Sequence, residues 1–372
     1  MLVSPLENTV LLTTLRRHSR VAALIAVSAS LALGLAACGD NAEGSSGDGG
    51  DVKVTLILKD LVNPFFVSLQ KGAEAQAEKD GVDLTIAAGD KDGDEASQIS
   101  AIESAVAAGQ DGILVLPSGP GVYSAIESAR DAGLVVIALD TPTDPADTVD
   151  TTFATDNFEA GQLIGQWAAQ HFAGEDVTIA MLDQFDDRVI QTDLNRNQGF
   201  LDGMGIDIAD KTQFRDEDSS GTYEGGGSYT IACNEPTTGA EDGGRTAMET
   251  CLTQDDSINL VYTINEPAAA GAYAALEAAG LEDDVTIVSI DGSCTGVQLV
   301  ADGVLGATSQ QYPGVMAEKG VETIADMVGG GSAPANSDGL EFVNTGTALV
   351  TDEAFDGLES VDTAEGSTLC WG

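Results

Sequence analysis

The sequence predicts an α/β protein built from two doubly wound parallel-sheet lobes, and three observations carry this prediction. Short apolar runs alternate with helical patterns along most of the 372 residues, and such alternation is typical of parallel sheets with right-handed crossovers. The alternation is interrupted once, at residues 141–155, which are rich in Asp, Thr and Pro, and it then resumes. The length suffices for two domains of ordinary size.

The first strand–helix unit sets the pattern for the rest. Residues 54–58 form an apolar run that predicts a buried strand, and Asn63-Pro64 then opens a helix that Gly81 ends. Proline suits the first helical turn and glycine suits the stop. Phe65 and Phe66 lie at this strand-to-helix connection, where an open α/β sheet binds its ligands. They predict a ligand platform, with an aromatic helix start packed in the core as the alternative.

The remaining elements follow the same periodicity. Further strands are expected at 82–88, 112–116, 134–139, 177–182, 258–263, 285–290 and 306–310. Further helices are expected at 95–108, 122–132, 157–172, 193–204, 242–252, 266–279, 296–302 and 315–328. The polar, Gly-rich stretch 216–227 is expected to be a surface loop.

The first 51 residues are expected to direct export and attachment. Basic residues precede an apolar run at 21–35, and Leu35-Ala36-Ala37-Cys38 follows. Residues 1–37 are therefore predicted to be a lipoprotein signal peptide with lipidation at Cys38, because the apolar run is shorter than the ~20 residues of a membrane span. Residues 38–51 contain GSSGDGG and are predicted to be a flexible tether.

Charge and composition exclude several functions. A formal charge of −46 disfavours nucleic acid and anionic membrane surfaces as partners, and it leaves neutral or cationic ligands open. Beyond the signal peptide, His171 is the one remaining histidine, which argues against a His-pair metal site and a His-dependent nucleophile. Residues 90–95 begin like a calcium loop, but Glu95 and Ala101 replace the required Gly and Glu, which favours a solvated turn. No glycine-rich phosphate loop follows the first strand. We therefore expect no metal and no cofactor.

Four cysteines remain after Cys38, namely Cys233, Cys251, Cys294 and Cys370. An even number in an exported chain predicts two disulfides, for which three pairings are possible.

Polar residues gather just past the carboxyl ends of the predicted strands. They are Asn63, Ser118, Asp140, Asp156, Asn157, Asn265, Glu266, Asp291, Gln310 and Gln311, and Arg196 opens a nearby helical turn. Together with flat aromatic rings, carboxylates, amides and a guanidinium suit a neutral polyhydroxy ligand in a crevice between the two halves. The alternative for any single Asn or Asp is a helix N-cap.

These residues resemble the periplasmic sugar-binding proteins of ABC importers, the ribose and fructose type above all. The resemblance covers nearly all of residues 52–372. It is carried by Asn63-Pro-Phe-Phe66, Ala138-Leu-Asp-Thr141, Ala154-Thr-Asp-Asn157, Asn265-Glu-Pro, Ile290-Asp-Gly292 and Gln310-Gln-Tyr-Pro313.

The resemblance implies a sugar site with residues from both lobes and the hinge. Implied ligand contacts are Asn63, Phe65, Phe66 and Asp140 from the first lobe, Arg196, Asn265 and Asp291 from the second, and Asn157 and Gln311 from the hinge; the strand-end pattern adds Ser118. Leu116 and Thr141 depart from the ribose pattern, where Asn and Arg are expected. The third aromatic of the family is expected to be Tyr223 or Tyr229. The implied disulfides are Cys233–Cys251 and Cys294–Cys370.

The resemblance also implies three crossings between lobes, near 155–157, 309–312 and 343–346. The first lobe would comprise 52–155 and 312–343, and the second 156–311 and 344–372. The resemblance implies a lipid-anchored binding protein that passes a monosaccharide to an ABC permease. The favoured ligand is fructose or a related sugar, and the protein is not expected to be an enzyme. Rival interpretations are a signalling receptor of the same fold that feeds a sensor kinase or chemoreceptor, a sugar-dependent transcription regulator, and an exported glycosidase.

Overall fold

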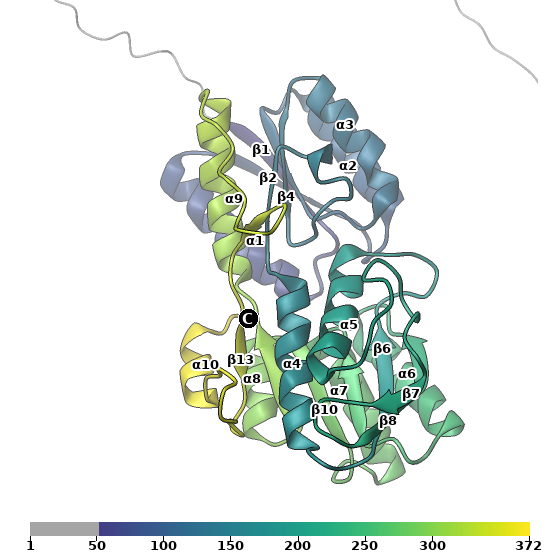
Figure 1. Cartoon of the computed structure of the whole chain (residues 1–372). Coiled ribbons are helices and arrows are strands. Elements are labelled where there is room, and N and C mark those ends of the chain that lie inside the picture. The colour runs from purple at the N-terminus through teal and green to yellow at the C-terminus, as the bar shows by residue number, and fades with distance from the viewer. Residues whose placement is uncertain (1–51) are drawn as a thin grey trace, which may run out of the picture. The chain divides into compact units, whose positions relative to one another are not determined.

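The computed structural model describes residues 52–372, which form two sheets flanked by helices (Figure 1). The predicted signal peptide, the lipidation site Cys38 and the whole predicted tether lie outside the described residues. Within the described part of the chain, no helix combines the length and the apolar character that crossing a membrane requires.

The first sheet has six strands in the order β12-β5-β4-β3-β1-β2, and all neighbours run parallel. The strands are β1 (Lys53–Leu58), β2 (Asp83–Ala88), β3 (Gly112–Val115), β4 (Val135–Leu139), β5 (Thr151–Ala154) and β12 (Val343–Asn344). Helices α1 (Pro64–Asp80) and α9 (Pro313–Val328) cover one face, and α2 (Glu95–Ala108) and α3 (Tyr123–Asp131) cover the other (Figure 1). We call this sheet with its helices the first lobe.

The second sheet has seven strands in the order β13-β11-β10-β9-β6-β8-β7. They are β6 (Val177–Asp183), β7 (Ser220–Thr222), β8 (Ser228–Pro236), β9 (Leu260–Thr263), β10 (Thr286–Asp291), β11 (Ala307–Gln310) and β13 (Ala348–Val350). Helices α4 (Asn157–His171) and α5 (Gln191–Met204) cover one face, and α6 (Glu241–Gln254), α7 (Glu266–Ala279) and α8 (Cys294–Ala301) cover the other. The short α10 (Thr363–Leu369) lies beside α8 near the C-terminus (Figure 1). This sheet with its helices is the second lobe.

The predicted fold class is confirmed, because helices cover both faces of each sheet and the chain passes three times between the sheets. The passages join β5 to α4, β11 to α9 and β12 to β13. Asn344 pairs with Ala154 in the first sheet, one residue beyond the predicted limit at 343. The division into 52–155 with 312–343 and 156–311 with 344–372 stays a prediction.

Several segments differ from the sequence prediction. The strands β8, β12 and β13 and the helix α10 lie where no element is predicted, and two stretches predicted to be irregular contain strands. The interruption at 141–155 contains β5, and the loop predicted at 216–227 contains β7, which pairs antiparallel with β8. Strand β5 is buried but reads Thr-Thr-Phe-Ala, so it lacks an apolar run, whereas β7 is exposed along its whole length. The edge strand β13 also pairs antiparallel, with β11.

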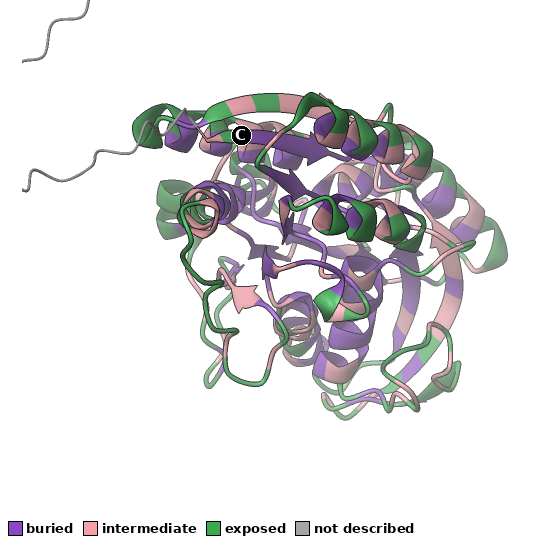
Figure 2. Ribbon diagram, turned by 90° about the horizontal axis from the view of Figure 1, so that it is seen from above, coloured by how far each residue is buried: buried purple, intermediate pink, exposed green. Residues whose placement is uncertain are grey.

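Burial follows this layered order. The strands are largely buried, and the exposed residues lie on the outer sides of the helices (Figure 2). The two faces of each sheet carry separate apolar clusters, so each sheet is packed on both sides. This double burial explains the short, nearly continuous apolar strands in the sequence.

Candidate functional site

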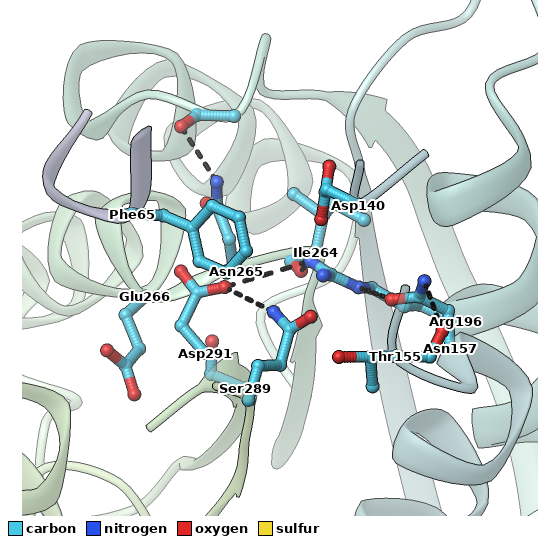
Figure 3. A network of polar contacts seen from close by, with 12 residues as sticks. Phe65, Asp140, Thr155, Asn157, Arg196, Ile264, Asn265, Glu266, Ser289 and Asp291 are labelled. Atoms are coloured by element: carbon cyan, nitrogen blue, oxygen red, sulfur yellow. Dashed lines mark hydrogen bonds and ion pairs between the residues drawn. The ribbon is translucent and has the colours of Figure 1, made fainter. Parts of the chain in front are cut away.

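The carboxyl ends of strands from both lobes meet at one pocket. It is lined by Lys59, Asn63, Phe65, Phe66, Asp92, Asp140, Gln184, Thr192, Arg196, Ile264, Asn265, Asp291 and Gln311. The lining thus combines cations, carboxylates, amides and two aromatic rings. It includes eight of the ten residues predicted to contact ligand, and part of their polar network is drawn in Figure 3.

Two carboxylates of this pocket lie in unusual backbone conformations. Asp140 follows β4 with φ of 65°, and Asp291 ends β10 with φ of 148°. Non-glycine residues rarely adopt positive φ, and such strain persists where the surrounding structure holds it and is frequent at ligand sites. Both carboxylates thus lie at strand ends on opposite sides of the pocket, where a strained backbone fixes their direction.

Asp291 is held by one polar neighbour from α5 and one from the connection between β11 and α9 (Figure 3). Gln311 Nε2 donates to Asp291 Oδ1 at 3.0 Å, and Arg196 Nη1 lies 3.9 Å from the same oxygen. Burial raises the pKa of the Asp291 carboxyl well above its ordinary value, and the Arg196 guanidinium opposes that rise.

Glu266, the first residue of α7, holds the turn that follows Asp291. Its carboxylate accepts from the backbone N–H groups of Gly292 at 2.8 Å and Ser293 at 3.1 Å, and from Thr308 Oγ1 at 2.9 Å. Burial raises the pKa of Glu266 to about 7 although these hydrogen bonds lower it. A buried carboxyl that does not line the pocket therefore holds the backbone directly after Asp291.

Arg196 is oriented by one residue outside the pocket, Asn157, and by the backbone of one residue that lines it, Ile264. Its Nε donates to Asn157 Oδ1 at 2.8 Å, and its Nη1 donates to the Ile264 carbonyl at 2.9 Å. Asn157 in turn donates to the Thr155 carbonyl at 3.1 Å. Helix α4 approaches α5 closely at Gly161. A Cβ atom at this position would lie only 2.2 Å from the Arg196 carbonyl oxygen. Asn157, predicted as a ligand contact, thus lies outside the pocket and orients Arg196.

Phe65 and Phe66 form the aromatic side of the pocket. Both are 4% exposed, and their rings meet edge to face with centroids 5.8 Å apart. Phe65 also packs edge to face on Trp371, with centroids 5.3 Å apart. The Trp371 indole N–H donates to the Gln311 carbonyl at 2.8 Å, which ties the C-terminal segment to the pocket.

The expectation that Tyr223 or Tyr229 completes the aromatic set is wrong. Both rings are buried in the apolar core of the second lobe, next to β6 and α4. The Tyr223 hydroxyl donates to the Phe172 carbonyl, and the Tyr229 hydroxyl donates to the Asp218 carbonyl at 2.8 Å. Neither ring can reach the pocket because core packing and these hydrogen bonds hold it elsewhere.

Both disulfides occur with the pairing that the resemblance implied. Cys233–Cys251 joins β8 to α6, and Cys294–Cys370 joins the start of α8 to the end of α10. The second bond lies directly before Trp371, so it anchors the segment that packs on Phe65.

The amides Asn63 and Asn265 line the pocket and also cap helices. Asn63 Oδ1 accepts from the Phe65 N–H at 2.9 Å, and Asn265 Oδ1 accepts from the Ala268 N–H at 3.0 Å. Ser118 is fully buried and does not line the pocket, and its backbone N–H donates to Gln98 Oε1 at 2.9 Å. Ser118 is therefore not brought into this site.

Five pocket residues were not predicted, namely Lys59, Asp92, Gln184, Thr192 and Ile264. Lys59 directly follows β1, so the strand-end argument applies to it as well. Asp92 lies in the segment 90–95, and the prediction of a solvated turn there is wrong for this residue. Its side chain is only 14% exposed because it packs into the pocket beside Lys59.

Comparisons with known proteins agree with this geometry. A family model described as a periplasmic binding protein domain matches residues 54–332. The ribose import binding protein RbsB of Salmonella typhimurium is 29% identical over 276 residues, which cover 74% of this chain and 84% of that protein. The galactofuranose-binding protein YtfQ of Escherichia coli is 27% identical over 249 residues, covering 65% of this chain and 71% of that protein.

A solved structure shows the same fold. The periplasmic solute binding protein of an ABC transporter from Actinobacillus succinogenes, with bound D-allose, superposes with a TM-score of 0.67 at 20% identity. The match covers 85% of this chain and 99% of that chain.

Proposed function

Because the chain belongs to the periplasmic binding protein family, we propose that it is an extracytoplasmic receptor that captures a neutral monosaccharide and delivers it to an ABC permease. Fructose or a related sugar is the favoured ligand. The similar proteins are binding proteins rather than enzymes, in accord with the expectation that this chain is not an enzyme. The names of the similar proteins give ribose, galactofuranose and allose as their ligands. All three belong to the proposed class of neutral monosaccharides.

The observation that carries this proposal is the pair of strained strand-end carboxylates, Asp140 and Asp291, on opposite sides of one pocket. Carboxylates accept hydrogen bonds from sugar hydroxyls, and the guanidinium of Arg196 donates to sugar oxygens. The rings of Phe65 and Phe66 cover the apolar C–H surface of a sugar. An anionic ligand fits less well because the pocket holds three aspartates and two cations.

We propose that capture is coupled to hinge closure. Contacts already join the lobes at the pocket rim, where Gln184 Nε2 donates to Asp92 Oδ2 at 2.6 Å and Arg188 Nη1 donates to the Gly93 carbonyl at 3.1 Å. A sugar that touches both lobes stabilises the closed arrangement by its differential contacts.

Attachment through lipid on Cys38 belongs to the same proposal, because the segment before it has the pattern of a lipoprotein signal. Expression of the full chain with a Cys38→Ser control tests it. We expect the parent in the membrane fraction and the variant in the soluble extracytoplasmic fraction, and equal release of both would contradict the anchor.

The ligand is tested by thermal unfolding of residues 52–372 with D-fructose, D-ribose, D-allose, D-galactose, D-glucose, D-xylose and myo-inositol. A sugar at about 100 times its Kd stabilises the fold by roughly 2.7 kcal/mol, which gives a clear rise in Tm. We expect one sugar or a small related group to raise Tm. A flat response to all seven would contradict a sugar receptor and favour a ligand of another class, as in a signalling receptor.

A further inference from the structure

The C-terminal segment leads from one lobe to the other. It follows α10, which lies beside α8 of the second lobe. The ring of Trp371, however, packs against the apolar cluster of the first lobe that contains Phe65 and Phe66, and it meets Phe65 edge to face with centroids 5.3 Å apart. Trp371 does not line the pocket itself. A side chain attached to the second lobe therefore supports an aromatic ring that lines the pocket from the first lobe.

Trp371 is held in this position mainly through Cys294 at the start of α8. The Trp371 carbonyl accepts from the Cys294 N–H at 2.9 Å, and a disulfide joins Cys294 to Cys370, the residue directly before Trp371. The hydrogen bond from the indole N–H to the Gln311 carbonyl is the third link. The disulfide is the covalent link among the three.

Helix α10 is fixed to the second lobe near its middle and not at its end. Gly366 is its one buried residue, and the Gly366 carbonyl accepts from Gln310 Nε2 at 3.2 Å. Leu369, the last residue of the helix, is 51% exposed. Helices shorter than about 12 residues are marginal in water without tertiary packing, and α10 has 7. The position of Trp371 therefore depends on the disulfide rather than on α10.

The two disulfides differ in their access to solvent. Cys251 is fully buried and Cys233 is 5% exposed, whereas Cys294 is exposed and Cys370 is half-buried. A reducing thiolate must reach a sulfur atom to open the bond, and exposed disulfides are the labile ones. A reductant should therefore open Cys294–Cys370 before Cys233–Cys251.

We propose that Trp371 is a positioning residue for the sugar and that the Cys294–Cys370 disulfide makes sugar binding sensitive to redox state, so that reduction of this bond weakens binding. This inference rests on the proposed function and deepens it, because it adds a regulation of the same site. In the oxidised protein, Trp371 keeps the Phe65 ring in place at the pocket. In the reduced protein, the segment after Gly366 is released and Phe65 loses its edge-to-face partner.

Thiol–disulfide exchange with a dithiol reductant supplies the chemistry. One thiolate of the reductant attacks a sulfur of the Cys294–Cys370 bond, and the other cysteine leaves as a thiolate. The second thiol of the reductant then displaces the first cysteine. Two electrons and two protons pass to the protein, which gains two thiols, while the reductant becomes a cyclic disulfide.

The test compares sugar affinity in the oxidised and the reduced protein. The panel sugar with the largest rise in Tm is titrated calorimetrically into residues 52–372, before treatment with dithiothreitol and after treatment and removal of the reagent. Alkylation and mass spectrometry identify the cysteines that carry thiols. We expect thiols at Cys294 and Cys370 and a Kd raised roughly fivefold, the effect of losing one edge-to-face aromatic pair. Reoxidation should restore the parental Kd.

Variants of Trp371 show whether the disulfide acts through this ring. Trp371→Ala should raise Kd by a similar factor in the oxidised protein, and reduction should raise it no further. Trp371→Phe keeps an aromatic ring beside Phe65, so it should retain most of the affinity and the response to reduction. A matched control that combines Cys294→Ser and Cys370→Ser should bind like the reduced parent with and without the reagent. The Tm without sugar shows that each protein is folded at the temperature of titration.

Three results would overturn the inference while sugar binding by the parent stands. They are a Cys294–Cys370 bond that resists dithiothreitol, an unchanged Kd in the reduced parent and the double serine variant, and a further loss of affinity when Trp371→Ala is reduced. A parent that binds no sugar of the panel would remove the proposed function and this inference together.

Discussion

Replacing Glu266 by Gln should remove a defined part of the pH dependence of stability. The pKa of the buried carboxyl is raised from 4.5 to about 7 in the folded protein. Between these values the folded state keeps a proton that the unfolded chain has released. The free energy of unfolding therefore falls as the pH rises through this interval, and it is highest below the unfolded value. At about 1.4 kcal/mol per pH unit, the fall due to Glu266 is about 3 kcal/mol.

Urea unfolding of residues 52–372 at several pH values between 4.5 and 8 measures this dependence. Asp183, whose pKa burial raises to about 6, acts in the same direction, so the parent curve is steeper than Glu266 alone would make it. The difference between parent and Glu266→Gln measures the contribution of Glu266 together with its effect on Asp291, whose pKa the Glu266 carboxylate raises. Glu277→Gln removes an exposed glutamate from the same helix and is the matched control. Identical pH slopes for the parent and Glu266→Gln would refute the reasoning.

Two further substitutions test how the pocket is supported. Trp371→Ala removes an edge-to-face pair with Phe65 that is worth about 1 kcal/mol. Calorimetric titration should therefore show a sugar affinity lowered roughly fivefold. An unchanged Kd would show that the C-terminal segment does not support the site. Gly161→Ala places a Cβ 2.2 Å from the Arg196 carbonyl oxygen, and overpacking of this kind costs about 1–3 kcal/mol. Its Tm should fall by several degrees while Gly314→Ala, which meets nothing within 4 Å, leaves Tm nearly unchanged; equal Tm values for these two variants would contradict the close helix contact.

Elements with strong local signals were predictable from the sequence. Helix α2 begins and ends where expected because Asp94 accepts from the Ser97 N–H and Gly109 adopts the left-handed conformation at the end. Strand β5 was missed because its burial comes from neighbouring strands and helices rather than from an apolar sequence. Its threonines are buried between β4 and β12, a tertiary effect that no local pattern records.

The site likewise contains residues that local sequence signals predict and residues that only tertiary packing reveals. Asp140 and Asp291 could be predicted because each ends a buried strand at the edge where ligands bind. Lys59 occupies an equivalent position, but a lysine in a strongly acidic chain is expected at the surface. The structure shows that Lys59 is buried, because the segment around Asp92 packs against it. Asn157 was assigned to the ligand because the sequence does not show that its amide instead faces Arg196.

The most direct test of a sugar site between the lobes is calorimetric titration of the best panel sugar into the parent and Asp140→Asn. Asparagine tolerates the positive φ of this position, so the variant removes the charge while keeping the backbone. A hydrogen bond to a charged group is worth about 1.5–3 kcal/mol, which predicts affinity lowered about 10- to 100-fold. Asp302→Asn, at an exposed position, should bind like the parent. Equal affinity of the parent and Asp140→Asn would contradict the account.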